Sequence, residues 1–101
     1  MKSARLLVLA AGFGLTGTAF ADLDLARKEG CLGCHAVDRK LVGPAWKDVA
    51  ARYKTEKGAV DKLAGKVRSG GKGNWGEVMQ PPNTTTSDAD IKKLVQFILT
   101  L

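Results

Sequence analysis

The stretch CLGCH, residues 31–35, contains both cysteines and the single histidine of the 101-residue chain. On a helical turn, residues three positions apart project from the same face, so the Cys31 and Cys34 thiols point together, with His35 directly behind them. A structural disulfide has no need of a neighbouring histidine, and zinc requires about four ligands. The stretch therefore predicts a site where two thiols and one imidazole act on one bound group.

The first 21 residues have the organisation of an export signal. Lys2 and Arg5 precede an apolar run at residues 6–15, and Ala19 and Ala21 supply the small side chains that signal peptidase accepts. The run is too short to cross a hydrocarbon layer of about 30 Å. We predict a signal peptide at residues 1–21, cleaved after Ala21, and a periplasmic domain at residues 22–101.

The mature domain would be small and basic. Loss of Lys2 and Arg5 lowers the formal net charge from +6 to +4, and the remaining Lys and Arg side chains are spread along the chain. This distribution favours contact with acidic proteins over nucleic acid. Chains of about 80 residues commonly need a disulfide, a metal or a cofactor to complete their core. Some such group is expected here.

Apolar periodicity predicts an all-α domain of three to four helices. A short helix is possible in residues 22–30, and further helices are predicted in residues 44–54, 58–69 and 87–101. The last begins with a capping signal, Ser87 followed by Asp88 and Asp90. No alternating strand pattern is found, and residues 38–43 and 70–86 are expected to be loops. The longer loop is expected to be functional.

The motif C-x-x-C-H in an exported chain is the attachment signature of c-type haem. Cys31 and Cys34 would form thioethers with the two vinyl groups, and His35 would ligate the iron through one ring nitrogen. A thioredoxin-like redox pair would require a βαβ pattern, which is not found, and zinc would lack a fourth ligand. A local disulfide beside a chance histidine remains the simplest alternative.

Met79 is the candidate for the second axial ligand, because it is the only methionine that remains after signal cleavage. A lone methionine more often fills a gap in a core, but this one lies on a loop rich in Gly and Pro. His/Met ligation leaves iron without an open position, favours Fe(II) and suits electron transfer.

Four segments in order, CLGCH, VGPAWKDVAARY (residues 42–53), GNWGEVMQPPN (residues 73–83) and the C-terminal helix, resemble the short bacterial class I cytochromes c. These are the cytochromes named with the numbers five-fifty-one and five-fifty-two. The resemblance covers almost the whole mature chain. It implies helices wrapped around one haem, and electron transfer in the periplasm from a membrane cytochrome complex to a terminal reductase, oxidase or peroxidase.

The resemblance also implies roles for single residues. The Pro44 carbonyl would accept a hydrogen bond from the His35 ring, and Asn83 would steady the loop that bears the distal ligand. Trp75 would donate to a haem propionate, with Lys66 nearby. The alternatives are that Trp75 only packs and that Lys66 is solvated.

The chain departs from its relatives at one position. They commonly read W-G-x-x-P-M-P-P-N, whereas this chain reads W-G-E-V-M-Q-P-P-N, which places Gln80 where the ligand is expected. Either a shifted loop still brings Met79 to the iron, or Gln80 faces it as a weak oxygen ligand or leaves the position open. An oxygen ligand would lower the reduction potential relative to sulfur.

Three functions follow from these alternatives. The first is a monomeric, non-enzymatic electron carrier, with Lys40, Lys47 and Lys72 steering redox proteins that have acidic docking surfaces. The second is a haem protein with an open or weakly ligated distal site, for small-ligand binding or peroxidase-like chemistry, in which Arg68 is the nearest strong donor. The third is a thiol oxidoreductase.

Overall fold

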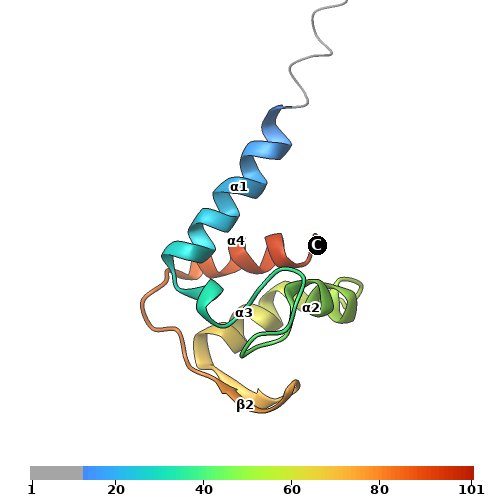
Figure 1. Ribbon diagram of the computed structural model, residues 1–101, viewed down its shortest axis with the longest axis vertical. Coiled ribbons are helices and arrows are strands. Elements are labelled where there is room, and N and C mark those ends of the chain that lie inside the picture. The colour runs from blue at the N-terminus through green and yellow to red at the C-terminus, as the bar shows by residue number, and fades with distance from the viewer. Residues whose placement is uncertain (1–12) are drawn as a thin grey trace, which may run out of the picture.

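The computed structural model describes residues 13–101 of the chain, the side chains from residue 19 onward. In this part the chain forms four α-helices, a single 3-10 turn and one two-stranded hairpin (Figure 1). In chain order they are α1 (Phe13–Lys28), η1 (Cys31–Gly33), α2 (Trp46–Tyr53), α3 (Ala59–Ser69), β1 (Gly71–Gly73), β2 (Gly76–Gln80) and α4 (Asp88–Ile98). The mainly helical fold confirms the predicted class.

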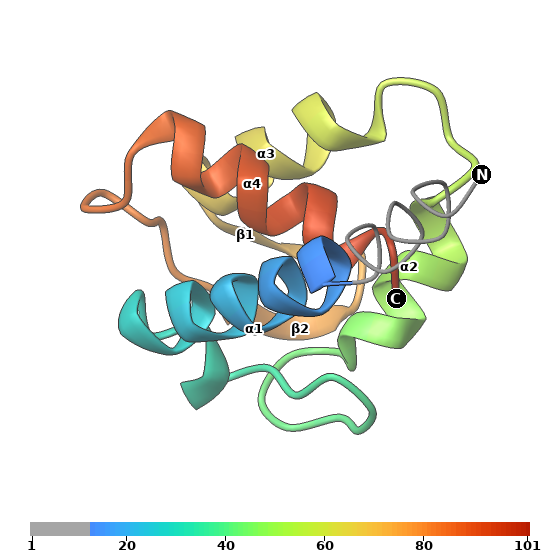
Figure 2. The same ribbon diagram turned by 90° about the horizontal axis from the view of Figure 1, so that it is seen from above.

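Helix α4 is the central element, since it packs against α1, α2 and α3 (Figure 2). Ser87 caps it as predicted: its side chain accepts a hydrogen bond from the Asp90 backbone N–H, at 3.2 Å. Ile91, Leu94 and Val95 are buried on the predicted apolar face. Phe97, which the predicted face did not include, is also buried and meets Trp46 edge-on, with ring centroids 6.4 Å apart.

The two middle helices form where apolar residues recur at helical spacing. α2 buries Trp46, Ala50 and Tyr53 on one side, and α3 buries Ala59 and Ala64. α2 begins two residues after Pro44, so the proline precedes the first turn instead of starting it. α3 ends at Gly70, whose positive φ of 71° suits a glycine in that position.

The loop expected at residues 70–86 contains the antiparallel hairpin β1–β2, so the expectation of no strand was wrong at this point. Both strands are short and largely exposed, and glycines take positive φ at Gly71, Gly73 and Gly76. Alternation of apolar and polar residues signals a strand with one buried face, and this exposed hairpin has none. Its glycines therefore looked like loop residues.

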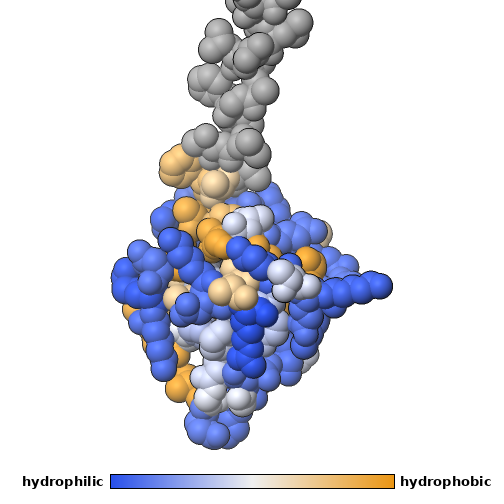
Figure 3. Space-filling view, turned by 90° about the vertical axis from the view of Figure 1, so that its right-hand side faces the viewer, coloured by the Kyte–Doolittle hydropathy of each residue, from blue (hydrophilic) through white to orange (hydrophobic). Residues whose placement is uncertain are grey.

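Helix α1 projects from the body of the molecule and includes the predicted cleavage site after Ala21 (Figure 1). The face seen in Figure 3 is mainly hydrophilic, and hydrophobic residues gather where α1 leaves the body. The first half of the predicted signal peptide, residues 1–12, lies outside the described residues. Among the helices described, none is both long and apolar enough to cross a membrane.

Candidate functional site

The CLGCH segment forms a helical turn directly after α1. Gly30 has φ of 80°, which ends the helix and redirects the chain into η1, and the His35 N–H then donates to the Cys31 carbonyl at 3.0 Å. Cys31 and Cys34 are half-buried and not joined as a disulfide. The turn presents both thiols and the imidazole from one short segment, as the spacing predicted.

The His35 ring is held in one orientation. Its Nδ1 lies 2.9 Å from the carbonyl oxygen of Pro44, so Nδ1 carries the proton that it donates and Nε2 keeps a free lone pair. Gly43 passes across the ring, and Trp46 stacks on it with centroids 5.8 Å apart and planes 22° from parallel. A neutral imidazole fixed in this way can ligate a metal through Nε2.

One cavity of about 650 Å³ joins the candidate residues from both halves of the chain. This volume is within the range of cofactor sites. Among its lining residues are all the candidate ligand and haem-contacting residues, Cys31, Cys34, His35, Pro44, Lys66, Trp75, Met79 and Asn83. The apolar side chains of α4 that face α2 and α3, Ile91, Leu94, Val95 and Ile98, line it as well. A cavity with apolar walls, two thiols and a free imidazole nitrogen fits a covalently attached haem.

Met79 and Gln80 both line this cavity from the end of β2. Met79 is 59% exposed. The backbone of Gln80 packs closely against Gly70, since a Cβ added at Gly70 would lie 2.5 Å from the Gln80 carbonyl oxygen. The two candidate distal ligands therefore lie side by side at the edge of one cavity.

Trp75 lies on the turn between β1 and β2 and is 40% exposed. The Arg52 guanidinium lies 4.8 Å from the centroid of its indole and donates to the Asn74 carbonyl at 2.7 Å. Tyr53 meets the indole edge-on, with centroids 6.5 Å apart. Sequence reasoning placed Tyr53 on the apolar face of its helix but did not connect Arg52 or Tyr53 with Trp75, because helical spacing carries no information about a residue more than 20 positions away.

Two of the three lysines expected around the cofactor, Lys40 and Lys72, line the cavity, and Lys47 does not. Lys66 also lines it, with an exposed side chain. Acidic groups are present in the same lining at Glu29 and Asp48, so the rim is of mixed charge.

Arg68 is not one of the cavity-lining residues. Its guanidinium donates to the carbonyl oxygens of Asn83 and Thr86, at 2.8 and 2.7 Å, and to the Asp88 carboxylate at 2.6 Å. Of the three acceptor residues, Asn83 lines the cavity, whereas Thr86 and Asp88 do not. In this arrangement Arg68 does not serve as an acid or donor for chemistry in the cavity.

The Cys31 thiol does not have the environment of a redox-active cysteine. Burial raises the pKa of Cys31, with further contributions from the nearby Glu29 and Cys34, and a backbone hydrogen bond opposes them. A raised pKa reduces the thiolate that thiol–disulfide chemistry needs.

Over residues 13–101, no three His, Cys, Asp or Glu side chains are grouped closely enough to hold a metal ion.

Residues 24–101 match the cytochrome c family. The chain belongs to this family. It is 50% identical over 102 residues to cytochrome c-552 of Nitrosomonas europaea, a match that covers 100% of this chain and 99% of that protein. It is 55% identical over 84 residues to cytochrome c-551 of Allochromatium vinosum, covering 83% of this chain and 89% of that protein.

The same relationship holds in three dimensions. The crystal structure of wild-type Nitrosomonas europaea cytochrome c552 superposes on this cytochrome with a TM-score of 0.76 and 51% identity, and covers 78% of this chain and 98% of that one. These matches confirm the resemblance inferred from the four ordered segments. The protein is a small cytochrome c with one covalently attached haem c, and it is an electron carrier.

Proposed function

We propose that this cytochrome is a periplasmic one-electron carrier whose haem is attached through Cys31 and Cys34 and ligated by His35 and Met79. One observation carries the proposal: Cys31, Cys34, His35 and Met79 line a single apolar cavity of about 650 Å³. When bound, the haem supplies an iron that changes oxidation state by one electron.

The protein's own residues prepare the site for that change. The Pro44 carbonyl holds the proton of His35 on Nδ1, which leaves the lone pair of Nε2 available as the ligand. The buried side chains Ile91, Leu94 and Val95 exclude water from one wall of the cavity. A dry, rigid environment limits the rearrangement of the protein and solvent that accompanies a one-electron change at the iron. The site therefore suits electron transfer better than substrate turnover.

The distal ligand is the finer part of the proposal. Met79 is the only thioether in residues 22–101. Its three rotatable bonds allow its sulfur to reach the iron although Met79 lies one position before the ligand of the relatives. Gln80 occupies that position and favours the second candidate function, an open or weakly ligated haem. The engagement of Arg68 outside the cavity favours the carrier, because Arg68 is then not available as a donor beside a vacant iron position.

The proposed partners are redox proteins with acidic docking surfaces. Electrons would pass from a membrane cytochrome complex to a terminal reductase, oxidase or peroxidase, with this cytochrome as a monomer. Lys40 and Lys72 at the cavity rim would raise the rate of encounter, which falls as salt screens the charges. The proposed location requires export and cleavage after Ala21, and the family match from residue 24 onward supports this boundary.

The first experiment is an optical spectrum of the exported protein, oxidised and reduced. We expect a haem that remains with the polypeptide after denaturation and acid extraction, and a weak near-infrared band from sulfur bound to ferric iron. Colourless protein with two titratable thiols would overturn the proposal. Covalent haem that binds carbon monoxide rapidly when reduced would instead favour the open distal site.

The second experiment tests the docking surface. Lys40→Gln and Lys72→Gln should lower the rate of reaction with an acidic redox protein and weaken its dependence on salt. Lys57→Gln is the matched control, since it removes the same charge from a residue outside the cavity lining. Equal effects at all three positions would show that net charge alone steers the encounter.

A further inference from the structure

The segment that follows the distal ligands is held by the last turn of α3. The Asn83 N–H donates to the Val67 carbonyl at 3.0 Å. Gly70 lets the backbone pass so closely that an added Cβ would lie 2.7 Å from the Pro82 nitrogen. These contacts fix the backbone after Gln80, whereas β1 and β2 before it are exposed. In the distal segment, residues 79–86, the C-terminal end is therefore the firm end, whereas the hairpin before it is held at its turn, by Arg52 and Tyr53.

Arg68 provides the strongest contacts at the firm end. Its guanidinium bridges the carbonyls of Asn83 and Thr86 and the Asp88 carboxylate, three acceptors within 2.8 Å that come from the loop and the start of α4. Hydrogen bonds from a charged donor are stronger than neutral ones, and the planar guanidinium can serve several acceptors at once. The Arg68 side chain is only 36% exposed, so water competes less than at an ordinary surface pair.

The contacts continue to the other side of the haem cavity. The Asn83 side chain accepts from the Thr85 and Thr86 N–H groups and donates to the Thr86 hydroxyl. The Thr86 hydroxyl in turn donates to the Glu29 carboxylate at 2.8 Å, two residues before Cys31. Thr86 is 3% exposed. One hydrogen-bonded group thus connects α3, the distal segment and the helix that leads into CLGCH.

We infer that Arg68 is a positioning residue for the distal ligand: by holding residues 83–86, it keeps the distal segment closed over the haem. This inference rests on the proposed haem site. It applies whether Met79 or Gln80 is the ligand, because both precede the held backbone by a few residues. Loss of the guanidinium should let the segment open more often without altering the ligand itself.

Binding of cyanide to the ferric holoprotein measures this opening, because cyanide reaches the iron only when the distal ligand has left. Arg68→Gln should accelerate binding at least tenfold. Arg68→Lys should give an intermediate rate, since its ammonium keeps the charge but has all its N–H groups on one nitrogen, whereas the guanidinium reaches these acceptors from two. The intermediate variant also covers the case in which Arg68→Gln does not fold.

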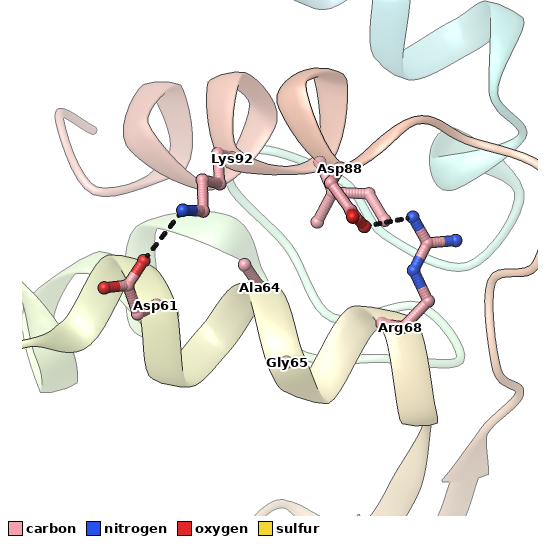
Figure 4. A pocket seen from close by; sticks show the side chains of 7 residues that line it. Asp61, Ala64, Gly65, Arg68, Asp88 and Lys92 are labelled. Atoms are coloured by element: carbon pink, nitrogen blue, oxygen red, sulfur yellow. Dashed lines mark hydrogen bonds and ion pairs between the residues drawn. The ribbon is translucent and has the colours of Figure 1, made fainter.

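Lys92→Gln is the matched control. Lys92 pairs with Asp61 at 3.3 Å and so joins the same two helices, α3 and α4, at the opposite end of a shallow cavity of about 290 Å³ (Figure 4). The substitution removes one positive charge, as Arg68→Gln does. Lys92, however, pairs with Asp61 on α3 and not with any of residues 80–86. Its cyanide rate should stay within twofold of the unmodified protein, and both variants should be compared at matched global stability in denaturant.

Three outcomes would overturn the inference. The first is an Arg68→Gln rate within twofold of the unmodified protein, and the second is equal acceleration by Lys92→Gln. The third is rapid binding by the unmodified protein itself, which would mean that no distal ligand closes the site. The first two outcomes would leave the proposed function standing, and the third would also overturn ligation by Met79. Failure of the proposed haem attachment would appear earlier, as protein without attached haem.

Discussion

The backbone of Gly43 lies against the face of the His35 imidazole. A Cβ added at this position would lie 2.5 Å from Cε1 and 2.9 Å from both ring nitrogens. Glycine is therefore required here by the close approach of the His35 ring, since any side chain would displace the ring. The VGP sequence thus does two things for His35: Gly43 makes room for the ring and Pro44 orients it.

Gly43→Ala should accordingly damage the proximal site. The ring must move away from the new methyl group and lose its hydrogen bond to Pro44, so we expect a lower yield of holoprotein and a partly high-spin ferric spectrum. Overpacking of this kind costs about 1–3 kcal/mol of unfolding free energy. Gly65→Ala is the control, because Gly65 has open space around it in α3 and alanine there should stabilise by up to about 1 kcal/mol.

Substitution of the two candidate distal ligands should distinguish them. Met79→Ala should abolish the near-infrared sulfur band of the ferric protein and lower the reduction potential, because iron loses a soft ligand that favours Fe(II). Gln80→Ala should retain the band. If Gln80 is the ligand, the unmodified ferric protein should lack the sulfur band, and Gln80→Ala instead of Met79→Ala should change the reduction potential. No change in either variant would indicate an open site.

Arg52 should stabilise the hairpin through Trp75. Arg52→Gln removes a cation from above the indole and the hydrogen bond to Asn74, and we expect a loss of about 1 kcal/mol in unfolding free energy. Denaturant titration measures this loss. Lys62→Gln is the control, since Lys62 lies 5.6 Å above Tyr53 but has no contact with Trp75, and its exposed pair with Glu56 should contribute about 0.5 kcal/mol or less. A larger effect at Lys62 than at Arg52 would contradict this assignment.

The cap of α4 should be energetically important because α4 is the central helix. Ser87→Ala leaves the Asp90 N–H without its acceptor and should cost about 1 kcal/mol, measured by chemical unfolding. Ser69→Ala makes the same change at a hydroxyl that only donates back to Gly65 within α3, and should cost less than about 0.5 kcal/mol. Similar losses of unfolding free energy at the two serines would mean that the cap of α4 contributes no more than an ordinary exposed hydroxyl.

Several parts of this structure were predictable because their signals are local. The periodicity of Ile91, Leu94 and Val95 indicated the buried face of α4, and Ser87 marked its start. The spacing of Cys31, Cys34 and His35 indicated a helical turn with one group of ligands, and the structure has that turn. Each of these patterns extends over only a few residues, which is the distance over which helical geometry relates one side chain to another.

The hairpin and the Arg68 contacts were not predictable in this way. The strands Gly71–Gly73 and Gly76–Gln80 are exposed and rich in glycine, so no apolar alternation marked them. Arg68 looked like a possible donor for the haem site, but its acceptors lie 15 to 20 positions further along the chain. Helical periodicity carries no information about such distant partners.

The chemistry of the site follows from the local sequence, since two thiols and an imidazole in CLGCH specify what can be attached and ligated. The helices follow from it as well, because caps and apolar spacing act within a few residues. Three features depend on the folded arrangement: the set of side chains around the cavity, the need for a small residue at position 43, and the contacts of Arg68 with residues 83–88. Those outcomes depend on packing between segments far apart in the chain, where the positions of several helices together set each contact.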